Sequence, residues 1–242
     1  MQNGAYRLYL GCCIIVMMLG QSLSTSKADH GPSTWQAAHQ AVVSVLPTWE
    51  GYAKPGFGAP PGVAPEGSGV VVDQTADDVF ILTAAHVVGR AIEVAIRSDA
   101  GGFGQAEILA VDEERDLALL RAQLRLNPVQ LNPEVPEIGS HVCVIANAFG
   151  LGLSFSCGVV SATGRSGIGF NAIEDFIQTD AAVNPGASGG ALVDAQGNLV
   201  GMVDAIFTKE ADIDAGVNFA VSARMIAETL TGWRESGIIP AQ

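Results

Sequence analysis

Short apolar runs separated by turn residues dominate the chain between residues 41 and 222. The runs are 41–49, 69–73, 79–85, 92–96, 106–112, 116–122, 141–146, 157–163, 175–180, 190–194, 199–207 and 217–222. Strand-length segments at such close intervals, bounded by Gly, Pro, Asn and Asp, are typical of antiparallel barrels and sandwiches. Long amphipathic helices do not alternate with them, which argues against a parallel α/β sheet.

Helical patterns occur near the two ends of this strand series. A short helix is predicted over 33–41, and a longer one over 222–233 with Ser222 as a plausible cap. Between them, residues 51–68 are rich in Gly and Pro and are predicted to form a loop. About ten strands in the remaining chain suit two small barrels, with residues 128–139 as the natural bridge.

The N-terminus has the pattern of a targeting segment. Arg7 precedes an uncharged apolar run over 8–19, which is short for a bilayer span and suits the core of a signal peptide. The prediction is a signal peptide over 1–28, cut after Ala28; the alternative is a retained N-terminal membrane tether. After removal of this segment we expect no membrane association.

Composition excludes several functions. The formal net charge of −13 argues against nucleic-acid binding, because phosphates need a basic surface. The chain has no C-x-x-C pair and no Cys/His cluster, so neither a metal nor a cofactor is expected.

Cys143 and Cys157 are the two cysteines that would remain after removal of the signal peptide. In an exported protein they form either a disulfide or two buried thiols.

The segment NPGASGGAL, residues 184–192, places Ser188 among glycines. Such a segment can be a surface turn or a catalytic loop whose N–H groups face a developing negative charge. It satisfies the G-x-S-x-G motif of α/β-hydrolases, but that fold needs a histidine after the serine and none follows His141. The order His, Asp, Ser therefore remains.

Two residues fit the other roles that a serine nucleophile requires. Among four histidines, His86 alone ends a buried apolar run, FILTAAHVV, although a lone histidine is usually structural. Asp116 precedes LALL and so enters a strand. Taken alone, Asp116 is more typical of a solvated charge at a strand edge than of a buried partner for histidine.

Several motifs together resemble one protease family. ILTAAHVV, DLALL and QTDAAVNPGASGGALVD resemble the histidine, aspartate and serine motifs of trypsin-like proteases of the HtrA/DegP type. GSGVVVD, ANAFGLGLSFSCGVVSATGR and AGVNFAVSARMI resemble the same branch, so that the agreement runs from about residue 35 to about residue 235. The resemblance implies an all-β fold of two six-stranded antiparallel barrels, the chymotrypsin-like double barrel, with a C-terminal α-helix. The expected protease domain spans 29–242, with barrels at about 41–127 and 138–222 and the helix at 222–235.

The resemblance also implies roles at the site. Ser188 would be the nucleophile, His86 the general base and Asp116 its orienting group. The backbone N–H groups of Gly186 and Ser188 would form the oxyanion hole.

Substrate-binding residues are expected at Ala182, Val183, Asp204 and Ala205. No acid occupies residues 181–187, which disfavours cleavage after Arg or Lys and favours a small aliphatic residue before the cut bond. The family more often has an uncharged polar residue at the position of Asp204. A carboxylate there either alters the preference or faces solvent.

The chain also departs from the family pattern. HtrA-type proteins usually carry PDZ domains after the protease, and none is expected before residue 242. Ala187 replaces the usual Asn before the serine, Ala191 replaces a Pro, and Ala148 stands where Pro is frequent. Ala187 puts basal activity in question, because this loop switches between active and inactive forms in the family. The family pairs the segments of Cys143 and Cys157 as a hairpin, where a cross-strand disulfide fits.

The expected function is that of an exported serine endopeptidase, periplasmic or secreted, acting in protein quality control on unfolded or damaged polypeptides through an acyl-enzyme. Trimers are common in the family. One alternative is a catalytically silent or zymogen-like binding or chaperone module on the same fold. A second is an esterase-like hydrolase that uses the same triad on small acyl substrates.

Overall fold

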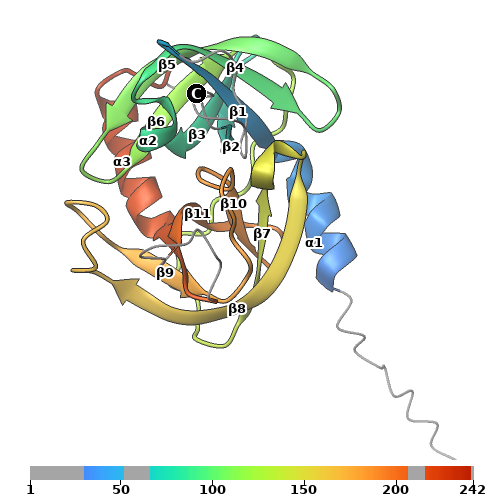
Figure 1. Cartoon of the computed structure of the whole chain (residues 1–242), viewed down its shortest axis with the longest axis vertical. Helices are drawn as coiled ribbons and strands as arrows, with labels where there is room; N and C mark the ends of the chain where they lie inside the picture. The colour runs from blue at the N-terminus through green and yellow to red at the C-terminus, as the bar shows by residue number, and fades with distance from the viewer. Residues whose placement is uncertain (1–29, 52–65, 207–215, 241–242) are drawn as a thin grey trace, which may run out of the picture.

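Two closed six-stranded antiparallel barrels form the molecule (Figure 1). The structure, a computed structural model, describes residues 30–51, 66–206 and 216–240. The strand orders around the barrels are β1-β2-β3-β6-β5-β4 and β10-β11-β12-β9-β8-β7. The predicted fold class, a double barrel with a C-terminal helix, is confirmed.

Strand bounds follow the apolar runs of the sequence. The first barrel contains β1 (Val42–Trp49), β2 (Gly67–Gln74), β3 (Val79–Ala84), β4 (Ala91–Ser98), β5 (Phe103–Asp112) and β6 (Leu117–Ala122). The second contains β7 (His141–Ala146), β8 (Ser154–Arg165), β9 (Phe176–Thr179), β10 (Ala191–Asp194), β11 (Leu199–Ile206) and β12 (Asn218–Ser222). The helices are α1 (His30–Ala38), α2 (Ala85–Val88) and α3 (Ala223–Glu235), with short 3-10 turns η1 (His39–Ala41) and η2 (Ala148–Gly150).

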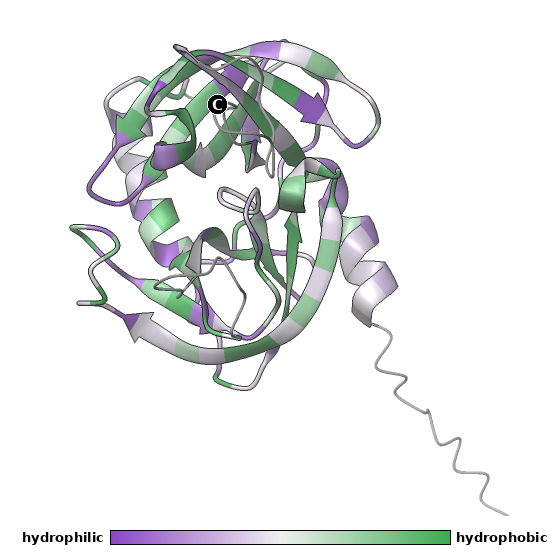
Figure 2. Cartoon of the chain, viewed as in Figure 1, coloured by the Kyte–Doolittle hydropathy of each residue, from purple (hydrophilic) through white to green (hydrophobic). Residues whose placement is uncertain are grey.

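Burial of the apolar strand residues accounts for the two barrels. All six residues of β3 are buried, whereas in the second half of β4 buried residues alternate with half-buried ones, and in the first half of β5 half-buried residues alternate with exposed ones. Figure 2 shows hydrophobic residues concentrated in the strands of both barrels. Strand closure leaves neither barrel with a free edge, so each is a stable support for the loops at its end.

Helix α3 fastens the two barrels together. It follows β12 of the second barrel and runs along one side of the molecule to the first (Figure 1). Its Ile226 and Leu230 belong to the same hydrophobic cluster as the core of the first barrel. Arg234 makes an ion pair of 2.8 Å with Asp73 of β2. Apolar burial and this charge pair therefore fix the helix against the first barrel.

Three features differ from the expectation or lie outside it. His86 lies on a one-turn helix, α2, which the run FILTAAHVV did not predict, because four residues carry too little periodicity. Gly67 and Ser68, expected in a loop, begin β2. The predicted signal segment lies outside the described residues. Among the described helices, none combines the length and the apolar character needed to cross a membrane.

The cap of α3 gives a test of this packing. The Ser222 hydroxyl accepts the Met225 N–H at 3.1 Å and donates to the Asp175 carboxylate. Replacing Ser222 by Ala should lower the free energy of unfolding by about 1–2 kcal/mol, because an N-cap and a buried charge-assisted bond are lost. Urea denaturation followed by circular dichroism measures the change.

The matched control is Thr231→Ala on the exposed face of the same helix, which should change stability by less than about 0.5 kcal/mol. Equal midpoints for the Ser222 variant and the unaltered protein would show that the cap does not hold the helix.

Candidate active site

His86 and Asp116 are held together where the first barrel ends. Asp116 precedes β6, and its carboxylate oxygens accept the His86 backbone N–H at 2.8 Å and Nδ1 at 2.6 Å. Its carbonyl accepts the Ala85 N–H at 3.1 Å. Asp116 is 8% exposed and has a φ of 54°, a conformation that costs free energy in a non-glycine residue. Asp116 is therefore buried and hydrogen-bonded to the imidazole, and is not the solvated strand-edge charge that its local sequence alone favours.

The glycines around Ser188 are required by close backbone packing. Gly186 has a φ of 93°, and a Cβ there would lie 2.5 Å from the carbonyl oxygen of Asn147. Gly189 has a φ of 85°, and a Cβ there would lie 2.1 Å from the carbonyl oxygen of Ser68. Both the backbone conformation and the available space exclude side chains at these two positions.

The N–H groups of Gly186 and Ser188 have no hydrogen-bond acceptor among the described residues. Because the N–H and C=O of a trans peptide point in opposite directions, the preceding carbonyl fixes the direction of each N–H. The Pro185 carbonyl accepts the Phe149 N–H at 2.7 Å. Phe149 itself has a φ of 57°, in the left-handed region, within η2. The Gly186 N–H is therefore turned away from the second barrel's η2 segment.

A second bond fixes the other N–H. The Ala187 carbonyl accepts the Gly190 N–H at 2.8 Å, so the Ser188 N–H points the opposite way. Two N–H groups that face no protein acceptor can both bind one oxygen atom, as an oxyanion hole does.

The Ser188 hydroxyl donates to the backbone carbonyl of Asp204 at 3.2 Å. Within the described structure no hydrogen bond joins it to His86. Both residues line one cleft. Hydrogen bonds between such groups often tighten only when substrate is bound.

Ser68 connects the two barrels beneath Ser188. Its hydroxyl accepts the Asn147 N–H at 2.8 Å and donates to the Gly186 carbonyl at 2.8 Å. Its N–H donates to the Ser188 carbonyl at 2.8 Å, and its carbonyl accepts the Thr83 hydroxyl at 2.7 Å. Sequence reasoning missed this role. The only signal was Ser68 within GSGVVVD, a motif that carried no chemistry of its own.

Asp204 lies on β11 and is 6% exposed. Its carboxyl oxygen accepts the Asn171 side-chain N–H at 2.7 Å, and one of its carboxyl oxygens lies within 4.8 Å of one from Asp116. The alternative in which this side chain faces solvent is therefore wrong. Asn171, which lies on the loop before β9, was not foreseen as a site residue.

A cleft of about 720 Å³ contains these groups. Besides His86, Asp116, Ser188 and Asp204, its lining residues are Ala85, Gly89, Arg90, Val111, Glu113, Phe170, Asn171, Val183, Asn184 and Pro185. Ala182 is exposed and is absent from the described lining of this cleft. The side chain of Ala205 lies outside the described part of the structure. Of the predicted substrate-binding residues, Val183 and Asp204 thus reach the cleft.

The three titratable groups perturb one another. Burial disfavours the charged form of His86, but the hydrogen bond and charge of Asp116 outweigh it and raise the pKa of His86. Burial likewise opposes ionisation of Asp116, yet its bonds to His86 lower its pKa. Burial, followed by the hydrogen bond and charge of Asp116, raises the pKa of Asp204 to about 7.

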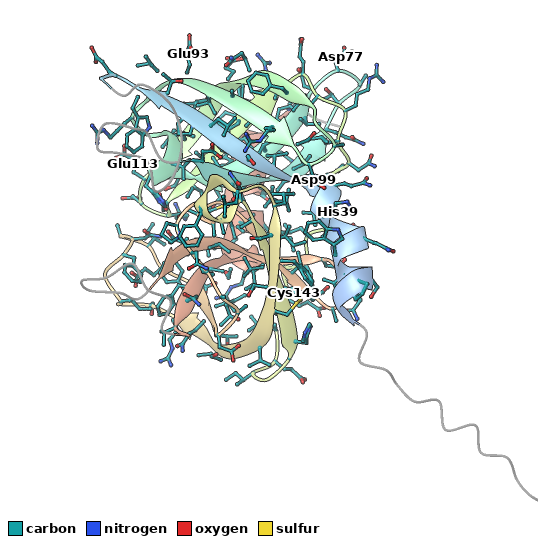
Figure 3. The ribbon with its side chains drawn as sticks, turned by 45° about the vertical axis from the view of Figure 1, so that its right-hand side comes forward. His39, Asp77, Glu93, Asp99, Glu113 and Cys143 are labelled. Atoms are coloured by element: carbon teal, nitrogen blue, oxygen red, sulfur yellow. A yellow bond between two sulfur atoms is a disulfide. The ribbon has the colours of Figure 1, made fainter. Side chains whose placement is uncertain are left out.

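Ligand atoms of His86, Asp116 and Asp204 lie within 4.8 Å of one another, close enough to share a metal ion. Their oxygens and Nδ1 are already hydrogen-bonded within the cluster, so a metal would have to replace these bonds. A second such group contains His141 beside Cys143 and Cys157, which the structure joins in a disulfide across β7 and β8. Figure 3 labels Cys143 in the second barrel.

Removal of the Ser68 hydroxyl tests the connection between the barrels. Ser68→Ala leaves the Asn147 N–H and the Gly186 carbonyl buried without their partner. We expect a loss of about 2–4 kcal/mol in the free energy of unfolding, at roughly 1–2 kcal/mol for each unpaired group. Chemical denaturation measures it.

Ser44→Ala is the matched control, since Ser44 is a buried serine of the adjacent β1 whose hydroxyl has no hydrogen bond among the described residues. It should cost less than about 1 kcal/mol. Equal losses in the two variants would show that the Ser68 hydroxyl has no special role.

Known proteins resemble this chain in both sequence and structure. Residues 67–202 match the trypsin-like peptidase domain. The periplasmic serine endoprotease DegP of Escherichia coli is 36% identical over 177 residues, covering 71% of this chain and 36% of that protein. The serine endoprotease DegS of Escherichia coli is 34% identical over 169 residues, covering 68% of this chain and 47% of that protein.

Among solved structures, the HtrA-type protease AlgW with a tripeptide is 35% identical with a TM-score of 0.74, covering 85% of this chain and 64% of that one. The chain thus spans less than half the length of the curated relatives DegP and DegS. The family match covers more than half of this chain and includes the His86, Asp116 and Ser188 segments. The chain belongs to the trypsin-like peptidase domain family, with HtrA-type proteases as its relatives.

Proposed function

We propose that the protein is a serine endopeptidase with Ser188 as nucleophile, His86 as general base and Asp116 as its orienting group. The observation that carries the proposal is the 2.6 Å bond between Asp116 and Nδ1 of His86. A proton on Nδ1 leaves Nε2 as the acceptor that a serine hydroxyl requires. The family match and the two unbonded N–H groups beside Ser188 support the same assignment.

The proposed reaction begins when the Ser188 hydroxyl leaves the Asp204 carbonyl and turns to Nε2 of His86. Its oxygen attacks the peptide carbonyl while His86 takes the proton. The N–H groups of Gly186 and Ser188 stabilise the oxyanion, and each such donor is typically worth about 2.7–4 kcal/mol. His86 then protonates the leaving amine, and water releases the acyl-enzyme by the reverse sequence.

The cleft supports polypeptide substrates. It is lined by Val183 and Phe170, and two of its three acids, Asp116 and Asp204, are held in internal hydrogen bonds, while the third, Glu113, is exposed. We therefore propose a small aliphatic residue before the cut bond rather than Arg or Lys. Unfolded or damaged proteins are the proposed substrates, an expectation that rests on the family resemblance alone.

We further propose that the protein is exported to the periplasm or secreted. The disulfide between Cys143 and Cys157 supports an oxidising compartment, and two relatives, DegP and DegQ of Escherichia coli, are named as periplasmic. Assembly into trimers is an expectation from the family alone.

Covalent labelling tests the nucleophile. A fluorophosphonate probe should modify Ser188 in the intact protein, as located by peptide mass mapping, because the site activates this hydroxyl and stabilises the resulting oxyanion. Ser188→Ala and His86→Ala should both abolish labelling. Ser156→Ala, which changes a serine outside the cleft lining, is the control and should label normally.

Absence of label on folded, unaltered protein would contradict the proposal and favour a silent binding module on this fold. Hydrolysis of small esters without any cleavage of unfolded polypeptide would favour the esterase alternative.

The role of Asp116 has its own test. Asp116→Asn should reduce kcat by about 10⁴-fold, the scale seen when a triad aspartate is lost, because the amide no longer selects the Nδ1–H tautomer. Steady-state kinetics on a peptide substrate measures it. A reduction below tenfold would contradict the assignment of Asp116, and Asp112→Asn, which alters a carboxylate outside the cleft, serves as control.

A further inference from the structure

Two buried carboxyl groups meet at this site, and the reaction described above uses only one. Asp116 is 8% exposed and Asp204 is 6% exposed, and a carboxyl oxygen of each lies within 4.8 Å of one of the other. Two ionised carboxylates have no donor between them, whereas a proton on one of the pair provides a donor for the other. Like charges buried side by side also favour retention of that proton.

Hydrogen bonding indicates which residue holds the proton. Asp116 accepts two N–H bonds from His86, at 2.8 and 2.6 Å, and these stabilise its ionised form. Asp204 accepts one amide N–H, from Asn171 at 2.7 Å, and is therefore left with a carboxyl oxygen to donate from. Its burial and the neighbouring Asp116 raise the pKa of Asp204 to about 7, in agreement with this assignment.

We propose that Asp204 is a positioning residue of the triad: its protonated carboxyl donates a hydrogen bond to Asp116, and loss of that proton adds a second negative charge behind His86. The inference rests on the proposed function for its catalytic meaning. The shared proton itself depends only on the geometry of the two carboxyl groups.

Other charged groups near the site are engaged elsewhere or lie across the cleft. Arg115 pairs with Asp112 at 2.8 Å and offers only its carbonyl to Asn171. Glu174 accepts four backbone N–H bonds from residues 168–171, which lower its pKa. Arg90 and Glu113 line the cleft, and β12, which pairs with β11, carries no titratable side chain. The charged groups that act on Asp204 are thus Asp116 and His86.

The consequence for pH dependence has a definite sign. The proposed base works as neutral imidazole, so activity rises as pH passes the pKa of His86. Ionised Asp204 stabilises the imidazolium and raises that pKa. The native protein therefore reaches full activity at a higher pH than it would with an uncharged residue at this position.

Asp204→Asn is the decisive variant, because the amide imitates a protonated carboxyl: its oxygen can accept from Asn171 and its NH₂ can donate to Asp116. The His86 imidazole is titrated by NMR in the intact chain and in the variant. We expect a broad, two-step curve in the intact chain and a single step in the variant, displaced to lower pH by roughly one unit.

Asp77→Asn is the matched control, because it makes the same chemical change at a carboxylate that is exposed at the outer end of the first barrel (Figure 3). It should leave the His86 curve unchanged. Superimposed curves for the intact chain and Asp204→Asn would overturn the proposal.

The kinetic counterpart is the profile of kcat/KM against pH. Asp204→Asn should move its rising limb to lower pH by the same roughly one unit. Asp204→Ala, which has no donor for Asp116, should lower kcat by about tenfold or more at every pH, a loss that the Asn variant avoids. Equal kcat values for the Ala variant and the intact chain would overturn the positioning role.

The NMR titration needs no turnover, so the two proposals fail separately. Suppose that the fluorophosphonate probe leaves the intact chain unlabelled and that the chain cleaves no polypeptide, while the two-step His86 titration is still observed. That result would support the shared proton and contradict the protease assignment. If the Ala variant does not fold, the Asn variant alone decides.

Discussion

Hydrogen bonding by one buried serine, Ser68, determines how the two barrels meet. His86 and Asp116 belong to the first barrel and Ser188 to the second, so the site exists only if the barrels keep a fixed relation. Ser68 is fully buried in β2 and bonds to the carbonyls of Gly186 and Ser188 across the interface. Glu66 adds a second connection through Asn147, at 2.7 Å. These bonds are made in a low-dielectric interior, where an unpaired partner is costly.

The contact between the barrels through Ser68 also bears on the directions of the Gly186 and Ser188 N–H groups. A loop of glycines is free to adopt many conformations, and glycine alone does not select one. The selection comes from carbonyls fixed by Phe149 and Gly190, and Ser68 holds the neighbouring Gly186 carbonyl. The buried Ala187 side chain packs in the core of the second barrel, which gives this loop an apolar anchor.

The sequence was sufficient to predict the double barrel, because strand-length apolar runs are local features. Local motifs also singled out His86, Asp116 and Ser188, which the structure places around one cleft. Ser68 was out of reach, since its partner Gly186 is 118 positions away and nothing in GSG marks a long-range bond. Asp204 stood in an apolar strand, but only tertiary packing shows that its side chain meets Asp116. The same holds for Asn171, whose partner is 33 positions distant.

The proposed function requires Ser188 to become covalently acylated. The most direct test is to mix the protein with a peptide thioester, quench rapidly with acid, measure the intact mass and map the adduct. We expect a transient acyl group on the peptide that contains Ser188 and none in Ser188→Ala. An adduct that persists in Ser188→Ala, or turnover of the thioester without any adduct on Ser188, would contradict the proposed function.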